Sequence, residues 1–239
     1  MALTGLILIA FVIGHLVGNL QVFEDPDRIN GYAHFLQSLG PALWFARIGL
    51  LVAVGLHIWA ATVLSLESLK ARGGKQYQKN RWLRATVASR YMRWTGYVVL
   101  AFIIYHLAQF TVGVATPATF KTNLPEYTMT GDYHVLGITV VRAGTHVLDV
   151  HTMVIRSFQN PIVSLFYIVS IFLLSVHLLH GTESLFQTFG WRNASWAKGL
   201  RAVVTLGVIL YFLGNVAIPG AVLTGGLTPR TDVLHTAQR

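Results

Sequence analysis

Five stretches of this sequence are each long and apolar enough to cross a lipid bilayer. Of the 239 residues, 54% are hydrophobic and only 11% are charged, which is not the composition of a soluble domain. A helix rises about 1.5 Å per residue, so about 20 apolar residues cross roughly 30 Å of hydrocarbon. The predicted spans are Ala2–Gln21, Leu43–Ser65, Trp94–Val114, Ile162–Leu185 and Leu200–Pro219. The sequence therefore predicts an all-α membrane protein with five transmembrane helices in a single domain, residues 1–239, and no internal repeat stands out.

Two span ends carry local signals. The first span lacks a preceding basic segment and a small-residue cleavage pattern, so we expect it to be retained as a helix. Asn160 is expected to cap the fourth span, with Pro161 at its first position.

Basic residues concentrate in two of the four connections. The second connection holds Lys70, Arg72, Lys75, Lys79, Arg81, Arg84, Arg90 and Arg93, and the fourth holds Arg192, Lys198 and Arg201. The first and third connections mix acidic with basic residues. Because short cytoplasmic connections carry the positive excess, we expect a cytoplasmic N-terminus and an external C-terminus. The net charge of +9 then reflects topology and a surface for anionic lipid or a partner protein, rather than nucleic acid, for which the sequence has no recognition motif.

The third connection, at about residues 115–161, is too long for a plain turn and should have structure of its own. A β-branched run at Val135–Val141, a turn at residues 142–144 and a second apolar run from Val147 are typical of a small external hairpin. Residues Asp149–Gln159 could instead form a short interfacial helix. The sequence leaves both alternatives open.

Four histidines lie one each within the first four spans, and the chain contains no cysteine. His15 and His106 lie toward the outer ends of spans predicted to run outward, and His57 and His177 lie toward the inner ends of inward-running spans. Each pair can therefore share one depth in the membrane. A histidine at bilayer depth is costly and is rarely left unpaired, so two matched pairs predict axial ligands for two haems, with spans one to four forming the haem-binding bundle. The alternative is that each histidine is a packed, hydrogen-bonded residue.

The other histidines carry less weight. His180 lies three residues after His177 on the same helix face, so either could face a haem while the other hydrogen-bonds a propionate or a quinone. Solvated histidines are the default expectation for loops and tails, which contain His134, His146, His151 and His235.

Several segments together carry a resemblance to a known family. They are Ser175–Gly181 followed by Ser184–Gln187, Tyr32–Leu36, and Gly14–Leu16 with Asn19. Over nearly its whole length the chain resembles the cytochrome b membrane-anchor subunit of succinate dehydrogenase and fumarate reductase, in the bacterial type in which one polypeptide of five helices holds two b haems. The resemblance implies that His15 and His106 ligate the distal haem and that His57 and His177 ligate the proximal one. In this family a histidine followed four residues later by glycine marks the fourth helix, which favours His177 over His180.

The resemblance implies one subunit of a heterotrimer in the bacterial cytoplasmic membrane. A flavoprotein subunit would oxidise succinate, an iron–sulfur subunit would relay the electrons, and this chain would carry them through two b haems to a quinone, with menaquinone expected. The absence of cysteine fits, because the iron–sulfur clusters would belong to the partner. Two alternatives stay open: a di-haem b subunit of another respiratory complex, such as a hydrogenase or a nitrate reductase, and a haem-free membrane anchor or transporter that uses histidines as proton relays.

A quinone site on this chain would need a proton donor beside the ring and polar groups for the two carbonyl oxygens. In the family a carboxylate often occupies the first outer connection near the distal haem, and here His34 takes that place as the expected catalytic residue. Asn19, Gln37 and Gln109 are candidate neighbours, although helix caps and interhelical hydrogen bonds explain them equally well. Arg47 is a candidate partner for a haem propionate, with snorkelling to the interface as the alternative.

Overall fold

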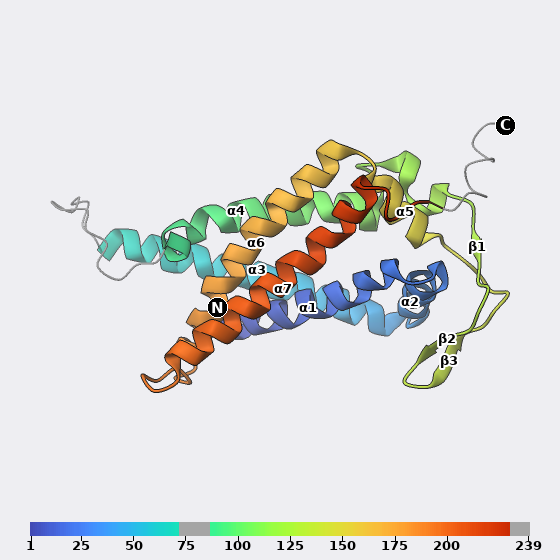
Figure 1. The fold of residues 1–239 in the computed structure, drawn as a ribbon. Coiled ribbons are helices and arrows are strands. Elements are labelled where there is room, and N and C mark those ends of the chain that lie inside the picture. Colours follow the sequence, from blue (N-terminus) through green and yellow to red (C-terminus); the bar gives the residue numbers. More distant parts are fainter. Residues whose placement is uncertain (72–86, 230–239) are drawn as a thin grey trace.

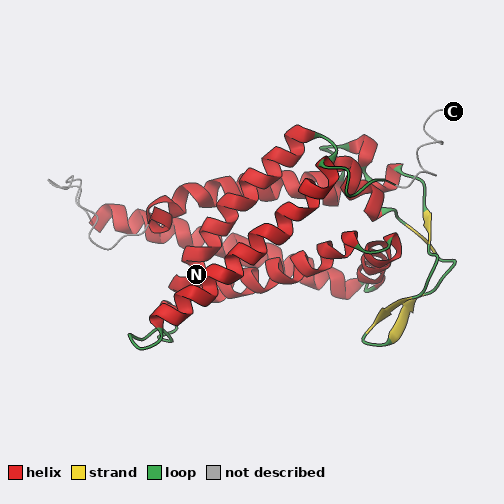
Figure 2. Ribbon diagram, viewed as in Figure 1, coloured by secondary structure: helices red, strands yellow, loops and turns green. Residues whose placement is uncertain are grey.

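The computed structural model of the chain contains the five long apolar helices that the sequence predicts. It describes residues 1–71 and 87–229, so the basic residues from Arg72 to Arg84 and His235 lie outside the described residues. The five helices are α1 (Ala2–Leu20), α3 (Pro41–Ala71), α4 (Val87–Leu107), α6 (Pro161–Thr188) and α7 (Ala197–Leu223). All five are long and apolar enough to cross a membrane, so the fold is that of an all-α, multi-pass membrane protein (Figure 1, Figure 2).

Some helix ends extend beyond the predicted spans. α3 continues to Ala71, past the predicted end at Ser65, and α6 continues to Thr188. Hydropathy marks only the part of a helix that lies in hydrocarbon, whereas the backbone hydrogen bonds continue through polar residues that favour helix. The start of α6 is as predicted. Pro161 is its first residue, and the Asn160 side chain accepts hydrogen bonds from two backbone N–H groups of the first turn at 3.0 and 3.4 Å.

The helices form two neighbouring pairs, α1 with α3 and α4 with α6, while α7 packs against α6 and α1 (Figure 1). α1 also packs against α6, which joins the two pairs. Among the described helices, α3 packs closely against α1 alone. Its remaining surface is apolar and exposed, with Trp44, Phe45 and Leu51 among its outward residues, as a helix facing lipid requires.

The two ends of the bundle differ in structure. We call the end that carries α2 (Pro26–Ser38) and residues 113–160 the connection end. We call the opposite end, where α3 stops, α4 begins and residues 189–196 join α6 to α7, the basic end. The short helix α5 (Val150–Phe158) lies at the connection end and packs against α2, α6 and α7 (Figure 1).

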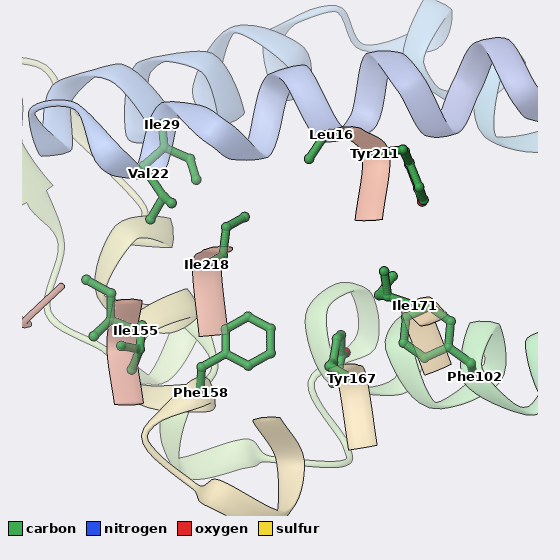
Figure 3. Close-up of a cluster of buried hydrophobic side chains, with 11 residues drawn as sticks. Leu16, Val22, Ile29, Phe102, Ile155, Phe158, Tyr167, Ile171, Tyr211 and Ile218 are labelled. Carbon is green, nitrogen blue, oxygen red and sulfur yellow. The ribbon is translucent and has the colours of Figure 1, made fainter. Parts of the chain in front are cut away.

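A cluster of buried apolar side chains runs from the connection end into the bundle (Figure 3). Its members are Leu16, Val22, Ile29, Phe102, Ile155, Phe158, Tyr167, Ile171, Tyr211, Ile218 and Val222. They come from the 3-10 turn η1 (Gln21–Phe23), from α2 and α5, and from every long helix except α3. Burial of these side chains holds α5 against the connection end of the bundle. Ile155 is fully buried, and burying such a side chain stabilises the fold by about 1.5–3 kcal/mol.

The third connection contains both structures that the sequence left as alternatives. The strands β2 (Tyr133–Val135) and β3 (Ile138–Val141) form an antiparallel hairpin, and α5 follows with Asp149 as its N-cap. The prediction that the hairpin turns at residues 142–144 is wrong. Its turn lies at Leu136–Gly137, where both residues adopt positive φ, 51° and 81°, as a two-residue hairpin turn requires.

Asp27 ties α2 to a second short strand pair, β1 (Tyr127–Thr128) with β4 (His146–Val147). Its carboxylate accepts four hydrogen bonds of 2.5–2.9 Å, from the hydroxyls of Tyr127 and Thr130 and from the backbone N–H groups of Thr130 and Gly131. Burial alone would raise the pKa of Asp27, but these hydrogen bonds outweigh it and lower that pKa below its usual value. The ionised carboxylate therefore anchors the connection to α2.

Asn30 makes a second link from α2, to the start of α5. Its side-chain oxygen accepts hydrogen bonds from the N–H groups of Val150 at 2.8 Å and His151 at 2.9 Å. The expectation that His151 is solvated is wrong, because it is buried in the first turn of α5. His134 and His146 are exposed, as expected.

Candidate functional site

Two pairs of histidine rings face one another between the helices. His15 on α1 and His106 on α4, the connection-end pair, have ring centroids 5.7 Å apart and planes at 87°. His57 on α3 and His177 on α6, the basic-end pair, have ring centroids 6.4 Å apart and planes at 63°. These are the two pairs that depth along the spans predicts.

Neither pair comes from helices that pack directly against each other. In the described part of the chain, α1 packs closely against α3 and α6, and α4 against α6, but α1 does not pack closely against α4, nor α3 against α6. The two histidine side chains of each pair therefore meet between two helices that do not pack closely against each other. A Cβ atom added at Gly14, Gly55 or Gly181 would meet no atom within 4 Å, and Gly14 and Gly55 lie on the exposed surface of their helices.

Two threonine hydroxyls hold the rings of the basic-end pair. Thr4 lies 3.3 Å from Nδ1 of His57, and Thr95 lies 3.3 Å from Nδ1 of His177. Each threonine donates its one hydroxyl hydrogen to the backbone carbonyl three residues earlier, at 2.9 and 3.0 Å. With its hydrogen on that carbonyl, the hydroxyl oxygen accepts from the histidine tautomer that is protonated at Nδ1. In this tautomer Nε2 keeps the lone pair that a metal ion binds.

A tyrosine plays the same part for one ring of the connection-end pair. The Tyr167 hydroxyl lies 3.3 Å from Nδ1 of His106 and donates its hydrogen to Oε1 of Gln109 at 2.8 Å. In this arrangement the tautomer of His106 that donates from Nδ1 fits, and it again leaves Nε2 free. Gln109 lies on a single π-helical turn, η2 (Ala108–Val112), directly after α4. Its side chain is buried behind His106, which favours interhelical support over quinone contact as its role.

The separation of the paired rings suits a haem. Two imidazoles bound on opposite sides of one metal ion, each about 2 Å from it, have ring centroids on the order of 6 Å apart. Within the described residues there is no group of three or more His, Cys, Asp and Glu side chains that could hold a metal ion. A haem needs only two protein ligands, because the macrocycle supplies the rest.

The sequence reading missed the hydroxyl partners and the repeat that marks two of them. Residues 4–16 and 95–107 share seven of 13 positions, in the pattern Thr-Gly, four residues, Ala-Phe, one residue, Ile, one residue, His-Leu. The shared phenylalanine makes the same contact in both copies. Phe11 lies against His15 and Phe102 against His106, with ring centroids 5.4 and 5.8 Å apart. Aligning the histidine-bearing spans on their histidines would have revealed this repeat.

The other predicted site residues lie at the connection end but do not gather into one cluster. His34 is half-buried and Gln37 exposed, both on α2, and Asn19 is half-buried one turn after His15 on α1. Within the described residues, no hydrogen bond or ring contact joins His34 or Gln37 to His15 or His106. The predicted quinone site is therefore not assembled by direct contacts.

Arg47 lies exposed on α3 near the connection end, with its guanidinium over the ring of Trp44 at 5.1 Å. Burial lowers the pKa of Lys121, and the positive charge of Arg47 lowers it further. These two cations therefore share one electrostatic neighbourhood, which suits an anionic group such as a carboxylate or phosphate.

His180 is half-buried, and its ring does not face His57. The neighbouring Glu183 pairs with Arg201 of α7, at 3.4 Å from Oε1 to Nε, and joins α6 to α7. Of the two histidines on α6, the one brought opposite His57 is His177.

Comparison of the chain with models of known families, with curated proteins and with solved structures gives no match. The fold and the site by themselves define a class: a multi-pass helical membrane protein in which four helices bring two pairs of histidine rings within 5.7 and 6.4 Å of each other.

Proposed function

We propose that this chain is the membrane-anchor subunit of a bacterial succinate:quinone oxidoreductase, carrying electrons from an iron–sulfur subunit through two b haems to a quinone. One observation carries the haem part: two pairs of histidines lie at the separation of axial ligands, and three of the four rings are hydrogen-bonded through Nδ1. A histidine held at Nδ1 keeps Nε2 for a metal ion. The choice of succinate rests on the sequence resemblance.

The four membrane histidines divide into two proposed haem sites. His15 and His106 would hold the distal haem at the connection end, and His57 and His177 the proximal haem toward the basic end. When bound, the haems supply one-electron carriers that amino-acid side chains do not provide. The helices would hold the ligands, and their apolar surfaces would border the haems.

The basic end supports a cytoplasmic docking role. Exposed cations surround it within the described residues: Lys70, Arg93, Arg192, Lys198 and Arg201. The flavoprotein and iron–sulfur subunits, together with anionic lipid, would meet this end, with the N-terminus in the cytoplasm. The quinone, with menaquinone expected, would then bind at the connection end beside His34, whose imidazole can carry protons.

A pyridine haemochrome assay of the purified complex tests the haem assignment. We expect two b haems per chain, one of them lost in His15→Ala or His106→Ala and the other in His57→Ala or His177→Ala, because an alanine cannot supply an axial bond. His134→Ala, at an exposed site on β2, should keep both. One haem or none in the unchanged protein would contradict the proposal.

Co-purification tests the succinate assignment separately. We expect the chain to retain a flavoprotein that oxidises succinate and an iron–sulfur subunit. Recovery of hydrogenase or nitrate reductase subunits instead would keep the haem sites but reject the succinate reaction.

A further inference from the structure

Thr4 and Thr95 occupy the same place in the two copies of the repeat. Each lies 11 residues before the histidine of its own helix, His15 or His106. Eleven residues make about three helical turns, so threonine and histidine lie on one helix face, about 16 Å apart along the axis. Each threonine then reaches a histidine of the other pair. α1 and α4 therefore each carry one histidine of the connection-end pair and one hydroxyl of the basic-end pair.

We infer that Thr4 and Thr95 are matched positioning residues for the haem site formed by His57 and His177. Each acts by accepting the Nδ1–H hydrogen bond of one ligand, which fixes the tautomer and the rotation of that ring. The inference rests on the proposed haem function and adds to it two residues that do not touch the haem iron.

The two contacts agree in detail although they come from different helices. Both contacts between hydroxyl and Nδ1 are 3.3 Å long, and both hydroxyls donate to the backbone carbonyl three residues earlier. The glycine after each threonine packs in the same way: a Cβ atom at Gly5 would lie 3.8 Å from Cε1 of His57, and one at Gly96 the same distance from Cε1 of His177. The Thr-Gly dipeptide therefore forms one surface for an imidazole ring, used twice.

Burial makes the Thr95 contact matter energetically. Thr95 is only 4% exposed, so water does not replace a lost hydroxyl easily, whereas Thr4 is half-buried and its loss should have the smaller effect. A ligand imidazole that donates from Nδ1 is more basic at Nε2, which favours the ferric over the ferrous state. Removal of the acceptor should weaken haem binding at this site and raise its midpoint potential.

The test uses Thr4→Val and Thr95→Val in the intact complex, since valine keeps the branched shape and removes the hydroxyl. We expect haem at the basic-end site to bind about 10–100-fold more weakly. Its midpoint potential should rise in a redox titration. The rise should be about 59 mV for each tenfold loss of haem affinity that affects only the ferric form. Thr4→Ser and Thr95→Ser should restore the unchanged values, because serine retains the acceptor.

Thr62→Val is the matched control. Thr62 is exposed on α3 and donates to the carbonyl of Ile58 at 2.8 Å, and among the described residues no hydrogen bond joins it to a histidine. It should leave both potentials unchanged, and the connection-end haem should keep its signal in every threonine variant, which also verifies folding.

Three results separate the inference from the proposed function. Two haems with unchanged potentials in both valine variants would overturn the positioning role alone. An equal shift in the serine and valine variants would do the same, because the hydroxyl would then not be the cause. Absence of haem from the unchanged complex would overturn the proposed function and the positioning role together.

Discussion

The role of a histidine in a membrane helix is ambiguous until the hydrogen-bond partner of its second ring nitrogen is known. For His57, His106 and His177 the structure supplies a partner, because a hydroxyl that can donate its own hydrogen elsewhere lies 3.3 Å from Nδ1. The sequence could predict the histidines, since ionisable residues are rare at bilayer depth. It could not predict the hydroxyls as partners, because threonine and tyrosine are ordinary in apolar helices and meet the rings only after the helices pack.

Tyr167→Phe tests this reading at the connection-end pair. The change removes the hydroxyl that lies against His106 Nδ1 and donates to Gln109 Oε1. The His106 and Gln109 side chains then each lose a hydrogen-bond partner. An unsatisfied buried polar group costs about 1–3 kcal/mol, so we expect lower thermal stability and about 10–100-fold weaker haem binding at that site. Optical redox titration should show the change in one haem only.

Tyr105→Phe is the control for this change, because the Tyr105 ring packs against Tyr167 at 6.2 Å without a hydrogen bond to His106. Similar losses in the two variants would mean that aromatic packing, rather than the hydroxyl, supports the site.

At the scale of elements, sequence periodicity and length predicted structures that depend on one continuous segment, such as a helix. They did not predict structures that depend on the pairing of two separate segments, such as a hairpin. The five spans and the Asn160 cap are local properties, and the sequence predicts them. The hairpin register is not local: β-branched residues at 138–141 indicate a strand but not its partner, and the turn at Leu136–Gly137 holds a non-glycine residue at positive φ that the sequence does not announce.

Asp27→Asn tests the link between α2 and the third connection. The ionised carboxylate accepts four hydrogen bonds, and their loss or weakening should destabilise the connection by about 1–3 kcal/mol, as expected for a partly exposed charged acceptor. Because the folded-state pKa lies below the usual value, this stabilisation is complete above pH ~4 and disappears as pH falls through the folded pKa. Hydrogen exchange at Thr130 and Gly131 should be faster in the variant at neutral pH, and the difference should shrink in acid.

Glu126→Gln provides the comparison for this charge change, since Glu126 is exposed in the same connection. Unchanged exchange in Asp27→Asn, or an equal effect in Glu126→Gln, would contradict the anchoring role.

At the scale of the whole molecule, the two ends of the bundle differ in charge and in structure. The basic end carries exposed cations, and the connection end carries α2, α5 and the short strands. α2 is held there by Asp27, by Asn30 and by the Tyr32 ring, which packs so closely on Gly18 of α1 that a Cβ atom would lie 2.6 Å from it. A quinone arriving from the membrane would therefore meet a fixed helix, on which the His34 imidazole lies half-buried.

His34→Ala tests whether the connection end reduces quinone. If the imidazole delivers protons or a hydrogen bond to the ring, the variant should lose at least tenfold in succinate–quinone turnover, the low end of what general acid–base groups contribute. Both haem spectra and the oxidation of succinate by a soluble dye should stay unchanged, since His34 makes no hydrogen bond or ring contact with His15 or His106 among the described residues. His34→Glu should recover part of the turnover, because a carboxyl group also carries a proton, whereas His146→Ala, exposed at the same end, should have no effect. Normal quinone turnover in His34→Ala would move the proposed reduction site away from α2 and toward the basic end, where electrons from the proposed iron–sulfur partner would enter before they reach the distal pair.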